Sequence, residues 1–188
     1  MSQFELGTDE ILTRVTIWIT IVSFAVGFTA FALSRNRRNW DAASRLAWTV
    51  ACAALLAHVA FAFHFYHAWS HDSAYRETAR QTESVIGLNW GGGLFINYAL
   101  VVGWIMDTSC WWVIGLEAYR SRLWPVAVAW RGFLIFIIFN ATVVFKTGFV
   151  RWAGLGLCFG LCFVWWLGAR HKFARGRSAA SALTLAKD

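Results

Sequence analysis

The chain alternates long apolar stretches with short polar connections. Five stretches are long enough to cross a bilayer, which takes about 20 apolar residues at 1.5 Å of rise each. They cover residues 12–33, 46–69, 91–116, 126–145 and 152–167. The alternation typical of a membrane β-barrel is absent, and lipid leaves a helix as the remaining way to satisfy the backbone. The sequence therefore predicts an all-α integral membrane bundle, with residues 1–188 forming one transmembrane domain of five helices.

A polar segment at residues 70–90 separates the second and third stretches. Asp72 or Ser73 can cap a helix there, and Gly87 is a typical residue for its end. We expect a short interfacial helix at about Tyr75 to Ser84, on the extracytoplasmic side of the membrane. This segment would cover the outer ends of the bundle as a lid.

Composition supports the membrane class. The chain has 188 residues, of which 59% are hydrophobic and only 14% are charged, and a soluble domain of this length could not cover so much apolar surface. Nine of the 13 Trp, Trp48 and Trp111 among them, fall near predicted span ends, where indole prefers the headgroup level. The net charge is +7, but the sequence has no nucleic-acid motif. We therefore expect the lipid bilayer as partner, and no nucleic acid.

The basic residues also predict an orientation. Eleven of the 17 Lys and Arg lie after the first stretch, after the third stretch, or in the tail at 168–188. The positive-inside rule places these parts in the cytoplasm and the N-terminus outside. Because the first ten residues carry three acids and no base, we expect no cleavable signal peptide. The predicted location is the bacterial inner membrane.

Four of the five histidines crowd into "HVAFAFHFYHAWSHDSAY", which begins at His58. On a helix that starts at residue 46, His64, His67 and His71 lie within about 60° of one another, whereas His58 points away. Neutral imidazole is the commonest ligand for zinc, copper and iron, so these three are the candidate metal ligands. Residues of the lid would complete the site, and the candidates are Glu77, Glu83 and Tyr75. Proton handling, pH sensing and simple filling of the interface remain alternatives.

Haem is limited by the number of histidines. Membrane haem b usually takes its axial histidines from two different helices, but the fifth histidine, His171, lies in the predicted cytoplasmic tail. A haem would therefore need a homo-oligomer that joins two second spans, or Met106 as a weak second ligand. Copper, iron, zinc and haem all stay open as cofactors.

Polar residues inside the spans form two further sets. Counted along the helices, Asp107 lies about 14 Å and Arg131 about 8 Å from the cytoplasmic boundary, on adjacent spans, which predicts an intramembrane ion pair. The second set falls in one layer about 9 to 12 Å below the outer boundary. It consists of His58, Asn97, Tyr98 and Asn140. This layer could form the floor of a cavity below the lid, or it could provide ordinary hydrogen bonds between helices.

The run "HxxHAWSHxxAYxxTARQT", followed by "GxNWGGGxxxNY" and "WxxD", resembles an uncharacterised family of small multi-spanning bacterial membrane proteins. The similarity covers residues 64–112. It implies that the histidines, the lid and Asp107 belong to one module, and it brings no known activity. The three glycines of this run suit a tight turn, a close backbone approach or an anion-binding nest.

These observations favour a multi-pass membrane protein whose outward-facing histidine cluster binds a transition metal or haem in a redox-type role. The alternative is a non-catalytic structural subunit that packs against partners in a larger membrane complex. A small transporter is less well supported, because no pair of broken half-helices occupies repeated positions. The sequence assigns no catalytic residue.

Overall fold

The computed structural model describes residues 7–33 and 38–185, and every regular element within these ranges is helical. The elements are α1 (Thr8–Leu33), α2 (Arg38–His67), α3 (His71–Ile86), α4 (Gly93–Val113), α5 (Leu116–Arg122), α6 (Trp124–Phe139), the π-helix η1 (Asn140–Val144) and α7 (Phe149–Leu185). Five of the helical segments in the described part are long and apolar enough to span a membrane. They are α1, α2, α4, α6 continued by η1, and α7 as far as Gly168, so the predicted bundle of five spans is confirmed.

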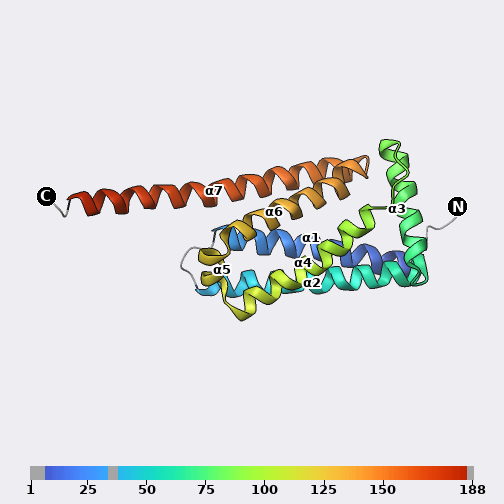
Figure 1. The fold of residues 1–188 in the computed structure, drawn as a ribbon, viewed down its shortest axis with the longest axis horizontal. Coiled ribbons are helices and arrows are strands. Elements are labelled where there is room, and N and C mark those ends of the chain that lie inside the picture. Colours follow the sequence, from blue (N-terminus) through green and yellow to red (C-terminus); the bar gives the residue numbers. More distant parts are fainter. Residues whose placement is uncertain (1–6, 34–37, 186–188) are drawn as a thin grey trace.

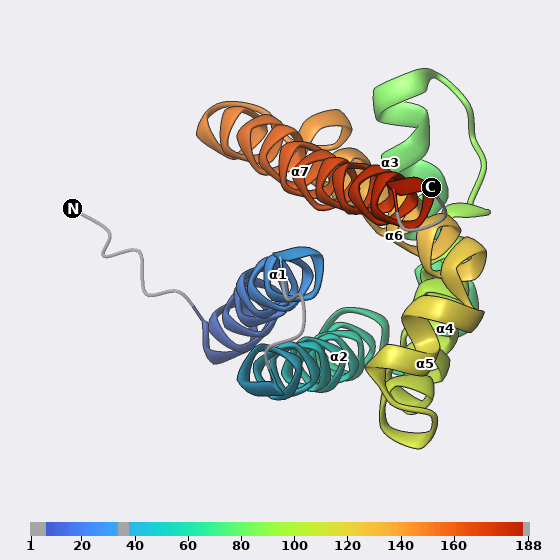
Figure 2. The ribbon, with the colours of Figure 1, turned by 90° about the vertical axis from the view of Figure 1, so that its left-hand side faces the viewer.

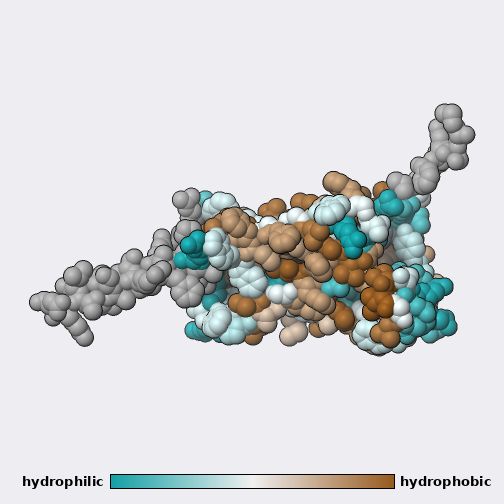
Figure 3. Space-filling model, turned by 90° about the horizontal axis from the view of Figure 1, so that it is seen from above, coloured by the Kyte–Doolittle hydropathy of each residue, from teal (hydrophilic) through white to brown (hydrophobic). Residues whose placement is uncertain are grey.

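The spans run along one common direction, and the two ends of the bundle differ. Figure 1 shows α3 at one end, near the start of α1, and α5 at the other end with the C-terminal part of α7. Viewed along the spans, α1 and α2 lie side by side, while α6 and α7 form a second pair (Figure 2). Apolar residues gather around the middle of the molecule and hydrophilic ones towards its ends, which is the distribution that a bilayer requires (Figure 3).

Aromatic residues form the core, and two of them were expected elsewhere. Trp48 and Trp111 are fully buried and stack with ring centroids 4.8 Å apart. Phe24 and Trp104 pack against Trp48, at centroid distances of 5.5 and 5.4 Å. The prediction that Trp48 and Trp111 belong to an aromatic belt is therefore wrong. For Trp48 the reason is that α2 begins at Arg38, eight residues before the predicted span, which moves the indole into the bundle.

The predicted short helix between the second and third spans is α3, and it is longer than expected. Its N-cap is Ser70, whose hydroxyl accepts a hydrogen bond from the Ser73 backbone N–H at 3.2 Å. Its C-cap is Gly87, as predicted, with φ of 74° and its N–H donated to the Glu83 carbonyl. Figure 1 shows that α3 crosses the end of the bundle.

The glycine run after α3 allows a close approach between α3 and the start of α4. A Cβ atom on Gly91 would lie 2.5 Å from the backbone oxygen of Tyr75, and one on Gly93 would lie 3.1 Å from Cγ2 of Thr78. Of the three interpretations that the sequence left open, the structure supports a close backbone approach.

Gly91→Ala should therefore lower the free energy of unfolding by about 1 to 3 kcal/mol, because the added methyl group meets backbone and the helices must move apart. Thermal unfolding of the purified protein in detergent measures the change. Gly132→Ala is the matched control, since a Cβ there has no atom within 4 Å, and Ala is the better helix former. Equal melting temperatures for Gly91→Ala and the wild type would contradict the close contact.

Candidate functional site

The helix that carries most of the histidines ends earlier than predicted. Ala68 and Trp69 have φ of 47° and 61°, in the left-handed region, so α2 stops at His67. The Trp69 N–H is donated to the Phe63 carbonyl at 3.0 Å, and the Ser70 N–H to the His67 carbonyl at 2.8 Å, so the chain turns back on the end of the helix. His71 therefore belongs to α3, and the prediction that three histidines share one face of one helix is wrong.

The three candidate metal ligands have different surroundings. His64 is exposed, and its ring lies 4.9 Å from that of Phe65. The ring of His67 packs edge-on against Phe63 at 5.6 Å. Nδ1 of His71 lies 3.0 Å from the hydroxyl of Tyr98, on α4. Within the described ranges, no group of three or more His, Cys, Asp or Glu side chains is placed to hold a metal ion.

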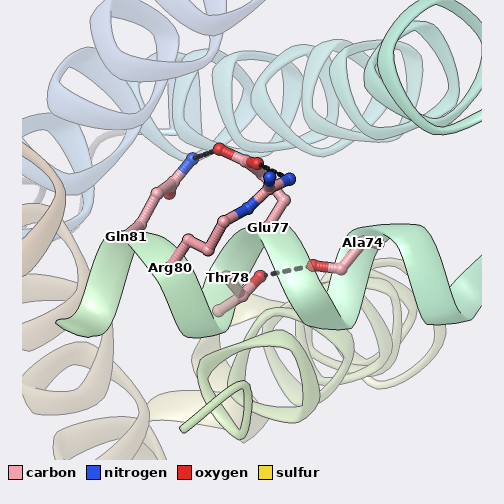
Figure 4. Close-up of polar contacts among 5 residues, drawn as sticks. All are labelled: Ala74, Glu77, Thr78, Arg80 and Gln81. Carbon is pink, nitrogen blue, oxygen red and sulfur yellow. Dashed lines mark hydrogen bonds and ion pairs between the residues drawn. The ribbon is translucent and has the colours of Figure 1, made fainter. Parts of the chain in front are cut away.

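Glu77, predicted to complete the metal site, has partners on its own helix. Its carboxylate forms an ion pair with Arg80 at 2.6 Å and accepts a hydrogen bond from Nε2 of Gln81 at 3.1 Å. Figure 4 shows Arg80 and Gln81 converging on this carboxylate. A metal ion that bound to the Glu77 carboxylate would therefore have to compete with Arg80 and Gln81.

The other two candidate ligands have structural contacts. The Glu83 carboxylate accepts a hydrogen bond from Nδ2 of Asn89 at 2.7 Å, which ties the end of α3 to the following loop. The Tyr75 ring packs edge-on against Phe95, with centroids 6.3 Å apart. Among the described residues, the predicted ligands therefore have separate contacts and are not gathered into one metal site.

The haem alternative does not fit within one described chain either. Met106 lies thirteen residues along α4, which is about 20 Å from the end of the bundle that carries α3. Its side chain is 63% exposed, on the apolar surface of the spans. Met106 and the histidines at the end of α2 therefore cannot bind the same haem iron. The side chain of His171 lies outside the described part of the structure.

The structure instead forms a pocket between the end of α2 and α3, which we call the lid pocket. Its volume is about 350 Å³. It is lined by Tyr66, His67, Ser73, Glu77, Arg80 and Gln81. Nδ1 of His67 is buried and has no hydrogen-bond partner among the described residues. A buried polar atom without a partner is unusual in a folded protein and calls for an explanation, of which a bound ligand or water is one.

The predicted polar layer is not assembled. Nδ1 of His58 lies 2.9 Å from the Thr13 carbonyl, which links α2 to α1. Asn97 is exposed, Tyr98 contacts the lid, and Asn140 donates to a backbone carbonyl one turn earlier on its own helix. Of the two interpretations of this layer, a cavity floor or ordinary hydrogen bonds between helices, the second describes His58.

The buried acid of α4 has two donors, and the sequence analysis connected neither of them with it. Asp107 is 8% exposed and accepts hydrogen bonds from Nε1 of Trp48, at 2.9 Å, and from the Tyr119 hydroxyl. Burial and the neighbouring carboxylate raise the pKa of Tyr119, so its hydroxyl stays protonated and remains a donor. Tyr119 lies on α5, beyond the span.

Arg131 belongs to the same buried region without touching the acid. It is 4% exposed, and its Nη1 donates to the Ala127 carbonyl at 2.8 Å. Its guanidinium carbon lies 3.8 Å from the centre of the Phe31 ring, a cation–π distance. Among the described residues, neither Nε nor Nη2 has a partner, and no ion pair joins Arg131 to Asp107. The two charges are neighbours within one aromatic cluster, and the predicted direct contact is absent.

The chain is a multi-pass helical membrane protein, as judged from the length and composition of its five spans. The chemistry of the lid pocket follows from the residues that line it. No protein-family model, no curated protein and no solved structure matches the chain.

Proposed function

We propose that this membrane protein binds a small anion, a carboxylate or an oxyanion, in the lid pocket, and that His67 is the principal contact. The observation that supports the proposal is the buried Nδ1 of His67, which faces no hydrogen-bond partner among the described residues. A ligand atom at this position would satisfy the imidazole.

The remaining lining favours an anion over other small ligands. Ser73 and Tyr66 bring hydroxyl groups to the pocket, and Arg80 and Gln81 have N–H groups beyond those that contact Glu77. The single carboxylate, on Glu77, is already paired with Arg80. The lining therefore offers more donors than acceptors, and an oxyanion with several acceptor atoms satisfies more of them than a cation would.

The test compares binding to two histidine variants. Acetate, phosphate and sulfate serve as probes, and calorimetry on the purified protein in detergent measures their affinity. His67→Ala should bind the preferred probe at least about tenfold more weakly, since a hydrogen bond to a charged group contributes about 1.5 to 3 kcal/mol. His64→Ala, at the same helix end but outside the pocket, should bind like the wild type.

Two results would overturn the proposal. One is equal affinity of His67→Ala and His64→Ala for every probe. The other is a stoichiometric transition metal in the purified wild type that is lost from both His67→Ala and His64→Ala, which would support the histidine metal site instead.

We further propose that the lid pocket faces the outside of a bacterial inner membrane, with the N-terminus outside and the C-terminus in the cytoplasm. The support is the charge distribution of the sequence together with the arrangement in Figure 1, in which the start of α2, α5 and the C-terminal part of α7 share the end opposite to α3. A reporter that is active only in the cytoplasm should work at the C-terminus and fail at the N-terminus. The reverse result would contradict the orientation and place the pocket in the cytoplasm.

A further inference from the structure

The end of the bundle opposite to the lid carries a second pocket, which we call the basic pocket. It lies between the start of α2 and α5 and has a volume of about 480 Å³. Its polar lining comes from Asp41, Arg45, Glu117, Ser121 and Arg122. The pocket is separate from the lid pocket and shares no residue with it.

Arg45 is held in place and has spare hydrogen-bonding capacity. Its guanidinium carbon lies 5.1 Å from the centre of the Trp112 ring, which orients the group. Its Nε is buried and has no partner among the residues that the structure describes. A guanidinium fixed in this way can donate to a ligand at little cost in side-chain entropy.

The charges around the pocket favour an anion. Arg45 and Arg122 line it with one opposing carboxylate, on Glu117. The other acid, Asp41, forms an ion pair with Arg120 at 2.9 Å, so its charge is compensated within the protein. A positive excess therefore remains at the pocket.

The residues around the pocket are of the kind found at the lipid headgroups. Arg45 is seven residues from the start of α2, which is about 10 Å along the helix. Three exposed tryptophans, Trp40, Trp112 and Trp124, lie at the ends of spans on this side, and exposed indoles are typical of the headgroup region. A ligand in this pocket can therefore keep its acyl chains in the bilayer.

We infer that the basic pocket binds the phosphate group of an anionic lipid, with Arg45 and Arg122 as donors. Phosphate accepts several charge-assisted hydrogen bonds, and basic pockets between membrane helices suit such headgroups. Glu117 opposes the charge, so its removal should strengthen binding. This inference does not depend on the function proposed for the lid pocket.

The experiment uses the full chain in nanodiscs of phosphatidylcholine, with phosphatidylglycerol added in increasing amounts. Native mass spectrometry of the released protein counts the phosphatidylglycerol molecules that stay bound. Arg45→Gln and Arg122→Gln should each weaken retention by about tenfold, because each loses a charge-assisted hydrogen bond. Glu117→Gln should strengthen retention, and Arg76→Gln, on the exposed face of α3, should leave it unchanged.

Two comparisons test the inference: the retention of phosphatidylglycerol by the variants, and the effect of added inorganic phosphate. The opposite effects of Arg122→Gln and Glu117→Gln distinguish an electrostatic site from a loss of folding, even if Arg45→Gln is unstable. Equal retention by Arg122→Gln, Glu117→Gln and Arg76→Gln would overturn the inference. Inorganic phosphate that stabilises the protein in pure phosphatidylcholine and displaces phosphatidylglycerol would assign the pocket to a soluble phosphate compound and overturn the lipid assignment.

Discussion

Asp107→Ala and Arg131→Ala should each lower the free energy of unfolding by about 3 to 5 kcal/mol, because each leaves a buried charge without its compensating partner. Both side chains are less than 10% exposed, so water cannot replace the lost charge. The double variant should be more stable than either single variant, although the guanidinium and the carboxylate share no direct ion pair. Their compensation acts across a dry aromatic cluster, where Coulomb interactions are weakly screened.

Titration with a denaturing detergent measures the three stabilities. Arg76→Ala is the control, since Arg76 forms an exposed ion pair with Asp72 and should change stability by at most about 1 kcal/mol. If the two single variants and the double variant were equally stable, the two buried charges would be energetically independent.

Trp48→Ala should destabilise the protein by about 3 to 5 kcal/mol, through the cavity left by a fully buried indole and the loss of its stacking on Trp111. Trp48→Phe should cost less, about 1.5 to 3 kcal/mol, because a ring remains while the hydrogen bond to Asp107 is lost.

Thermal unfolding in detergent separates the two contributions of Trp48. Trp18→Ala provides the reference for an indole on the apolar surface, where the side chain is 52% exposed. A melting temperature for Trp48→Phe equal to that of the wild type would show that the hydrogen bond to Asp107 contributes nothing, and that packing alone fixes the indole.

The five spans and the short helix could be predicted because they depend on apolar length and on a polar interruption that ends at Gly87. The end of α2 could not, because Ala68 and Trp69 adopt left-handed conformations that usually belong to glycine or asparagine. That single turn moved His71 to another helix and removed the geometric basis of the metal site.

The surroundings of Asp107 were equally hard to predict. The donor role of Trp48 could not be predicted. Hydropathy places the start of the second span after the polar residues of the first two turns of α2, which puts Trp48 at the span end and not in the core. The other donor to Asp107, Tyr119, lies twelve residues later on a short helix beyond the span, and no spacing rule connects the two. The position of Asp107 and Arg131 inside apolar spans predicted that each charge needs a polar or charged partner, but it did not predict which groups are the partners.

The order of these partners along the chain has a consequence for membrane insertion. A carboxylate in the middle of a span costs a few kcal/mol when it faces lipid alone. Trp48 precedes Asp107 in the chain, Tyr119 follows within twelve residues, and Arg131 comes last. During synthesis, α4 can therefore enter the bilayer against an indole already in place on α2. When α6 is synthesised, Arg131 packs near an Asp107 carboxylate that already accepts hydrogen bonds from Trp48 and Tyr119.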